Sequence, residues 1–153
     1  MTNRFKEILK GKVVLVGIGN ILRGDDGFGP ALIERLKGKV RAVCLDASVT
    51  PENYVARIAD ENPDTVLLVD AVSLQQQPGE YELIGSSDIV QSGMTTHDIS
   101  LRMFIEYLKG QTQANIYMLG VQPKNISIGD EISPPVQETL EVVEQILKEV
   151  LGA

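Results

Sequence analysis

The sequence contains a single cysteine and a single histidine, and no apolar run in it approaches the roughly 18 residues that a membrane span requires. One cysteine can form neither an internal disulfide nor a cysteine-based metal cluster. Basic residues are also few, since 14 Lys and Arg stand against 21 Asp and Glu and give a formal charge of −7. This acidic balance disfavours general binding to nucleic acid or to anionic lipid. We therefore expect no nucleic-acid partner and no membrane insertion.

Several common chemistries also lack their sequence motifs. Gly17 and Gly19 are not followed by the third glycine of a dinucleotide fingerprint, because Leu22 stands at that position, and no GK[ST] sequence occurs. A serine hydrolase would carry a G-x-S-x-G elbow, which is also missing. Cys44 lies inside the apolar stretch VCL, where a small core residue is the expected role. Nucleotide binding and ordinary nucleophilic proteolysis are thus disfavoured.

The overall composition is that of one soluble globular domain. The 153 residues are 43% hydrophobic and 23% charged, close to the averages for such domains, so we expect a single domain over residues 1–153. The first residues, MTNRFKEILKGK, mix both charges without the long apolar stretch of an export signal. We therefore expect a cytoplasmic protein.

Five segments are predicted to form strands. Continuous β-branched and aliphatic runs at 12–17, 40–46 and 65–72 are typical of strands buried on both faces, and 115–121 is the last strand of this kind. Residues 79–84 follow a Pro-Gly turn signal and alternate polar with apolar side chains. This alternation favours a half-exposed strand, antiparallel at one edge of the sheet.

Helices are predicted between these strands. One begins at Pro30 and ends at Gly38, and a second begins at Thr50 and Pro51. A third spans 98–109, and a closing helix begins after Pro134 and Pro135. This alternation implies right-handed crossovers, so we predict an α/β fold with a single doubly wound, mainly parallel sheet of about five strands and helices on both faces.

Acidic residues follow each of the first three predicted strands. Asp25 and Asp26 come after the first strand, Asp46 after the second, and Asp70 closes the third. In a doubly wound sheet, ligands bind beyond the carboxyl ends of the strands. A single Asp there is ordinarily a cap or turn residue. Because carboxylates at apolar strand ends are costly without compensation, the whole set points to a shared cation or proton site.

His97, in the segment MTTHD, precedes the helix predicted at 98–109. A lone histidine is most often a surface or core residue without a ligand. Together with Asp26 and Asp70, however, it would supply one nitrogen and two oxygens and leave positions open for ligands from elsewhere. Such a set suits zinc or nickel better than calcium.

These segments carry a resemblance to a known family. With GNILRGDDGFGP, the LLVDA strand end, TTHD and LGVQP in this order, the sequence resembles the endopeptidases that mature nickel-iron hydrogenases by trimming the large-subunit precursor. The resemblance extends from Val13 to about Leu147. It is strongest to the branch serving formate-hydrogenlyase-type hydrogenases, because position 26 is Asp rather than Glu and because of the TTHD and LGVQP segments.

The resemblance implies that Asp26, Asp70 and His97 are the metal-contacting and catalytic residues. It also implies that the nickel belongs to the substrate, where it is held by cysteines of the precursor, so no permanently bound cofactor is expected. The enzyme would then cut off a C-terminal extension just beyond the last metal-binding motif of the precursor. Asp25 and Asp46 are candidates for activating the attacking water, as is nickel acting as a Lewis acid. For Asp25, a turn role in the glycine-rich loop is the preferred interpretation.

Two alternatives come from other functional classes. A phosphoacceptor receiver domain would use Asp25, Asp26 and Asp70 with Thr95 and Lys124, but its paired acids follow the first strand at once, whereas Asp25 stands eight positions after Gly17. A receiver also leaves Asp46 and His97 unexplained. A nickel-delivery protein would fit the ligands but lacks the histidine-rich tract typical of such proteins.

Overall fold

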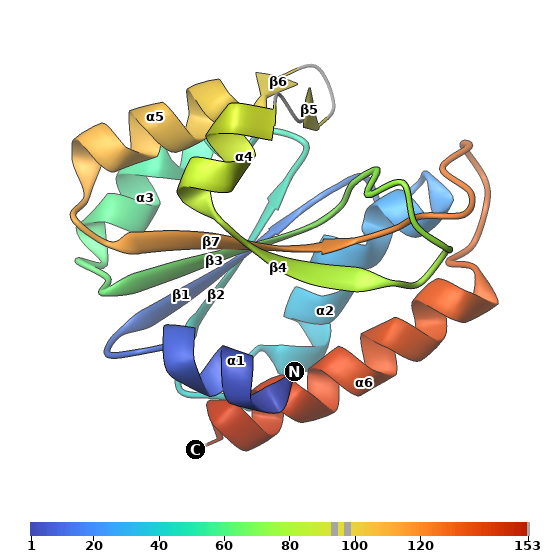
Figure 1. Ribbon diagram of the computed structural model, residues 1–153, viewed down its shortest axis with the longest axis horizontal. Helices are drawn as coiled ribbons and strands as arrows, with labels where there is room; N and C mark the ends of the chain where they lie inside the picture. The colour runs from blue at the N-terminus through green and yellow to red at the C-terminus, as the bar shows by residue number, and fades with distance from the viewer. Residues whose placement is uncertain (93–94, 97–98, 153) are drawn as a thin grey trace.

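A five-stranded sheet with the order β2-β1-β3-β7-β4 forms the centre of the molecule (Figure 1). The computed structural model describes residues 1–92, 95–96 and 99–152. The sheet confirms the predicted fold class, since four strands are parallel and the edge strand β4 is antiparallel to β7. The strands are β1 (Val13–Ile18), β2 (Val43–Ser48), β3 (Thr65–Ala71), β4 (Tyr81–Gly85) and β7 (Asn115–Val121).

Helices cover both faces of this sheet, as predicted (Figure 1). One face carries α1 (Thr2–Ile8), α2 (Phe28–Leu36) and α6 (Pro134–Val150), and the other carries α3 (Val55–Asp60), α4 (Ser86–Ser92) and α5 (Leu101–Gln111). A short hairpin of β5 (Thr95–Thr96) and β6 (Ile99–Ser100) contacts α5. None of the described helices combines the length and the apolar character needed to cross a membrane.

The core is divided in two by the sheet. Every residue of β1 and β3 is buried, because both strands are covered on both faces and successive side chains point to opposite sides. In β1, Val13 and Leu15 join the core beneath α1, α2 and α6, whereas Val14 and Val16 join the core beneath α3, α4 and α5. This explains why the two strands are continuous apolar runs in the sequence.

The second strand differs from its predicted boundaries. The sequence predicts it at 40–46, but it spans Val43–Ser48, and Val40 instead forms an isolated bridge with Gly152. Its pairing with β1 shifts register after Asp46, where the Ser48 N–H donates to Asp46 Oδ1 over 2.9 Å and Ser48 takes a φ of 52°. Asp46 therefore lies within the strand, because this local irregularity lets the ladder continue past it.

The helices also differ in detail from their predictions. The helix expected from Thr50 starts as a 3-10 turn, η2 (Pro51–Tyr54), and becomes α-helical at Val55. The helix expected over 98–109 is α5, described from Leu101, while Asp98 lies outside the described residues. The short α1, α4 and η1 (Gly24–Gly27) were not predicted, since segments of at most seven residues span too few turns to show a helical period.

Ion pairs connect α2 to α6 on the face of the sheet that these two helices cover. The Glu144 carboxylate forms ion pairs with Arg35 Nη1 at 3.0 Å and with Lys148 Nζ at 2.6 Å. The hydrogen bond from Lys148, followed by that from Arg35, lowers the pKa of Glu144 against the opposing effect of its burial. On the same face, Cys44 packs against the core as expected, and burial raises the pKa of its thiol although Lys37 acts in the opposite direction.

Truncating a strand residue should destabilise the fold. Leu68 is fully buried in the centre of β3, so Leu68→Ala should lower the free energy of unfolding by ~2–5 kcal/mol through lost burial and a residual cavity. Urea unfolding followed by circular dichroism measures this change. Met103→Ala is the control, because Met103 is exposed on α5 and its loss should cost no more than about 0.5 kcal/mol. Equal stability of the two variants would contradict the central position of β3.

Candidate active site

The sheet has a topological switch point between β1 and β3. From β1 the chain crosses through α2 on one face to β2, and from β2 it returns through α3 on the opposite face to β3 on the other side of β1. The loops that leave the carboxyl ends of β1 and β3 therefore diverge. This is where doubly wound sheets bind their ligands.

Asp26 lies in the 3-10 turn η1, which follows the loop that leaves the carboxyl end of β1. Its side chain is half-buried, and its Oδ2 accepts a hydrogen bond from the Asn20 N–H over 3.0 Å. Asn20 is itself fixed by an Asx turn, in which its Oδ1 accepts the Leu22 N–H over 2.9 Å. The loop thus orients the Asp26 carboxylate, and η1 contacts β3.

Asp70 is the second-to-last residue of β3 and is fully buried. Strand alternation directs its side chain to the same face as Leu68, the face covered by α3, α4 and α5. The start of α2 is pressed against this strand end, because a Cβ added to Gly29 would lie 2.4 Å from the Val69 carbonyl oxygen. Asp26, three residues before Gly29, and Asp70, directly after Val69, are thus held on adjoining elements.

His97 lies outside the described residues, so the meeting of Asp26, Asp70 and His97 stays a prediction. The strands β5 and β6 that flank His97 contact α5, on the face toward which Asp70 points. Within the described ranges, no three His, Cys, Asp or Glu side chains are grouped so that they could hold a metal ion.

Asp25 is fully buried and occupies the centre of a hydrogen-bond network. Its Oδ2 accepts the N–H groups of Lys124 and Asn125 and the Ser133 hydroxyl, at 2.8, 3.1 and 2.7 Å. Its Oδ1 accepts the Ser133 N–H at 2.7 Å. The carboxylate therefore ties the loop after β7 to the turn that carries Asp26.

The structure does not bring Asp46 together with Asp70. Asp46 is exposed on β2, where it pairs with Gly17 of β1, and β1 separates β2 from β3. Lys124, which the receiver alternative requires, has an exposed side chain and offers only its backbone N–H to Asp25. A paired action of Asp25 and Asp26 is not supported, since the Asp25 carboxylate is occupied by its own network.

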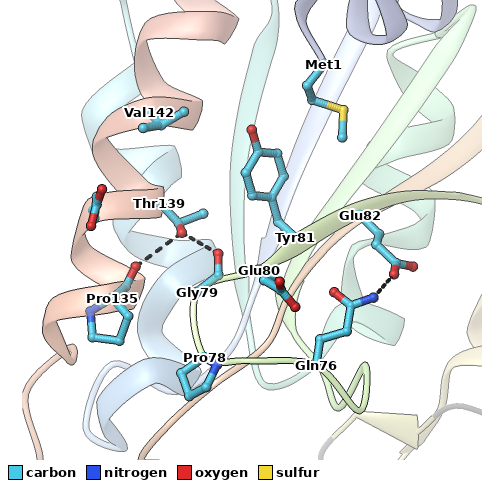
Figure 2. A pocket seen from close by; sticks show the side chains of 11 residues that line it. Met1, Gln76, Pro78, Gly79, Glu80, Tyr81, Glu82, Pro135, Thr139 and Val142 are labelled. Carbon is cyan, nitrogen blue, oxygen red and sulfur yellow. Dashed lines mark hydrogen bonds between the residues drawn. The ribbon is translucent and has the colours of Figure 1, made fainter.

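A cavity of about 780 Å³ lies elsewhere, between the start of β4 and α6 (Figure 2). Thr139 of α6 donates to the carbonyl oxygens of Gly79 and Pro135 at its wall, and Tyr81 points into it (Figure 2). Its lining contains neither Asp26 nor Asp70. Burial raises the pKa of the Tyr81 phenol. The cavity is therefore separate from the strand ends that carry Asp26 and Asp70.

Two residues of the site were not predicted from the sequence, although signals for both exist. Asn20 orients Asp26, and an Asn directly after a strand and a glycine favours an Asx turn. Ser133 binds both oxygens of Asp25, and a Ser before two prolines at a helix start is typical of an N-cap position. Their partners, 6 and 108 positions away in the chain, cannot be inferred from these local signals.

Replacing Asp25 should loosen the loop after β7. In Asp25→Asn one carboxylate oxygen becomes an NH2 group, which faces N–H donors and leaves at least one of them unpaired, so unfolding should be easier by roughly 1–3 kcal/mol. Amide hydrogen exchange should quicken at Lys124, Asn125 and Ser133. Asp46→Asn serves as the control, because exposed Asp46 accepts one bond and should change stability by less than about 0.5 kcal/mol. Unchanged exchange in Asp25→Asn would contradict the anchoring role.

Three comparisons with known proteins agree. The family model for hydrogenase maturation proteases matches residues 30–150. The chain is 33% identical over 138 residues to the hydrogenase 3 maturation protease of Escherichia coli strain K12, covering 88% of each protein. It also matches the crystal structure of the [NiFe] hydrogenase maturation protease HycI from Thermococcus kodakarensis KOD1 with a TM-score of 0.87 and 33% identity, over 97% of this chain and 98% of that one. The chain therefore belongs to the hydrogenase maturation protease family, and it is a peptide-bond hydrolase that acts in the maturation of hydrogenases.

Proposed function

We propose that this protease removes the C-terminal extension of a nickel-loaded hydrogenase large-subunit precursor and recognises the nickel that the precursor carries. The observation that carries the proposal is the arrangement of Asp26 and Asp70 on adjoining elements at the switch point of the sheet. Two carboxylates on rigid elements can meet a metal whose remaining ligands come from another protein. The metal is then part of the substrate, and its presence decides whether the precursor is accepted.

Asp70 is assigned the main electrostatic role. Its carboxylate is fully buried, and a cation gains more from a carboxylate in a site of low dielectric than from one in water. Asp26 adds a second oxygen from a half-buried position, held by the Asn20 N–H. His97 would complete the set with a nitrogen ligand, as the family resemblance implies. We therefore assign all three residues to contact with the substrate's nickel.

The nickel is assigned to the substrate because this ligand set is a poor permanent site. Two carboxylates and one imidazole, without a thiolate or a second imidazole, hold a borderline metal weakly. Cysteine thiolates of the precursor would supply the stronger ligands. When the precursor docks, its metal would fix the nearby peptide bond relative to the protease, and this orientation would account for much of the rate enhancement.

The attacking water would be activated beside this metal. Asp25 would have to give up part of its hydrogen-bond network to act as a base. Asp46 lies in β2, which β1 separates from the strand that carries Asp70. We therefore favour the Lewis acidity of the substrate's nickel over either helper. The chemistry is then carboxylate-based and uses no protein nucleophile. The cytoplasmic location expected from the sequence is part of the same proposal.

Removing the charge of Asp70 should abolish cleavage without unfolding the protein. Asp70→Asn keeps the shape of the side chain but removes the negative charge that would face the metal, so cleavage should fall on the order of 100-fold. Cleavage of the nickel-loaded precursor and urea unfolding are measured on the same samples. Asp46→Asn, an acid at the end of a neighbouring strand, should stay fully active. An active and normally stable Asp70→Asn protein would remove Asp70 from the mechanism.

Cleavage should require nickel in the precursor and no metal on the resting protease. The protease is first treated with a chelator and desalted, and then mixed with precursor prepared with or without nickel. Mass spectrometry follows the release of the C-terminal peptide, which should appear only with the nickel-loaded precursor. Equal cutting of both precursors would refute substrate-borne nickel as the signal. Activity that is lost on chelation and restored by zinc would indicate a conventional metallopeptidase.

A further inference from the structure

Exposed apolar side chains gather beside the Asp26 turn. Eight large apolar side chains of the described residues are exposed, and four of them lie on two loops: Ile21 (70%), Leu22 (66%), Ile126 (48%) and Ile128 (78%). The first loop follows β1 and leads into η1, and the second follows β7. We call these four residues the apolar rim. Exposed apolar groups that cluster in this way are typical of protein interaction sites.

The two loops are bound to each other, so the rim is a preformed surface. The Gly129 N–H donates to the Leu22 carbonyl at 2.9 Å, and Arg23 Nε donates to the Ile126 carbonyl at 3.1 Å. The Asp25 N–H donates to the Asn125 carbonyl at 2.8 Å. Figure 1 shows the turn before α2 and the loop before α6 side by side at the carboxyl edge of the sheet. A preformed surface loses less conformational entropy on binding than a mobile one.

Glycine at position 24 permits this close packing of the loops. Gly24 has a φ of 55°, and its N–H donates to the Asp130 carbonyl at 3.1 Å. A Cβ at this position would lie 2.5 Å from the Asn125 carbonyl oxygen. The left-handed backbone and the close contact both require glycine. The rim therefore depends on the same turn that carries Asp26, two residues further along.

An acidic pocket opens next to the rim. It has a volume of about 450 Å³ and is lined by Ile21 and Ile132 together with Asp130 and Glu131, without any Lys or Arg. Both acids belong to the exposed part of the loop. An apolar edge with two carboxylates beside it suits a partner segment that presents aliphatic side chains next to a Lys or Arg.

We propose that the apolar rim and its acidic pocket are the docking surface for the body of the precursor, which binds there with an apolar segment that includes a basic residue. The inference rests on the proposed function, because a protein substrate whose metal reaches Asp26 must cover the surface next to this turn. The rim shares its loop with Asn20, which holds the Asp26 carboxylate. Docking would thus supply affinity, while the metal site tests for nickel.

The test compares a rim variant with a matched control on the full-length protease. Ile126→Ser combined with Ile128→Ser makes the outer rim polar, and Val142→Ser does the same to an exposed aliphatic residue of α6 beside the other cavity (Figure 2). Binding of nickel-loaded precursor is measured by calorimetry, and cleavage is measured over a range of precursor concentrations. The rim variant should raise Kd and KM by about tenfold or more and leave kcat within about twofold, whereas the control should match the wild type.

The outcomes separate docking from cleavage. If the wild type binds the precursor but does not cut it, the proposed function fails, while the binding measurement still decides the role of the rim. Unchanged Kd and KM in the rim variant would overturn the docking surface and leave the function intact. A change in oligomeric state with unchanged precursor binding would assign the rim to a second copy of this chain and overturn the proposal. Unfolding midpoints exclude misfolding, and Ile128→Ser alone provides a milder variant.

A second experiment tests the role of the acidic pocket. Asp130→Asn combined with Glu131→Gln keeps the side-chain shapes and removes two charges. Wild-type binding should weaken as salt is raised from 50 to 300 mM, on the order of fivefold by screening, and the neutral variant should show a smaller dependence together with weaker binding at low salt. A neutral variant with wild-type affinity at low salt would overturn the basic residue as the partner of this pocket.

Discussion

The buried carboxylate of Asp25 holds together two loops at the carboxyl edge of the sheet. Four donors from residues 124–133 converge on its two oxygens, although this loop is about 100 positions away in the chain. A buried charge is tolerated only when it is hydrogen-bonded, and here the bonds satisfy loop N–H groups that would otherwise need water. One carboxylate thus joins the loop after β7 to the turn after β1. The position of Asp26 and the shape of the apolar rim both follow from this connection.

The switch point brings the turn that carries Asp26 and the strand that carries Asp70 together at one edge of the sheet. Gly29 lets α2 start against the Val69 carbonyl, so the turn bearing Asp26 contacts the strand bearing Asp70. The two acids differ in environment, since Asp70 is fully buried and Asp26 is only half-buried. This difference suits a site in which one carboxylate supplies a strong local field and the other meets the incoming partner. The two other acids predicted at the strand ends have structural roles. Asp25 binds the loop after β7, and Asp46 accepts the Ser48 N–H where β2 shifts register.

In the proposed function, the neighbouring surfaces would divide recognition into two physical tasks. An apolar rim gains affinity from area removed from water, without discriminating between precursors with and without metal. A pair of carboxylates gains little from a peptide alone but much from a cation. Because the loops of the rim are bound to the turn that carries Asp26, the proposed docking and metal sensing would occur in one encounter. The acidic net charge of the chain agrees with a partner segment that carries basic residues.

The sequence by itself determined the strands, because β1, β3 and β7 are buried on both faces and must be continuous apolar runs. It also predicted a mainly parallel sheet with an antiparallel edge, which the structure confirms. The family resemblance of its motifs predicts Asp26, Asp70 and His97 as site residues. Only the tertiary structure decided that Asp25 is an anchor, because its donors are 99 to 108 positions away and no local pattern encodes them. Only the structure showed that β2 continues past Asp46 to Ser48, because its register against β1 shifts after Asp46. Local propensity and burial periodicity are properties of short segments, whereas hydrogen bonds between distant loops exist only once the sheet has brought those loops together.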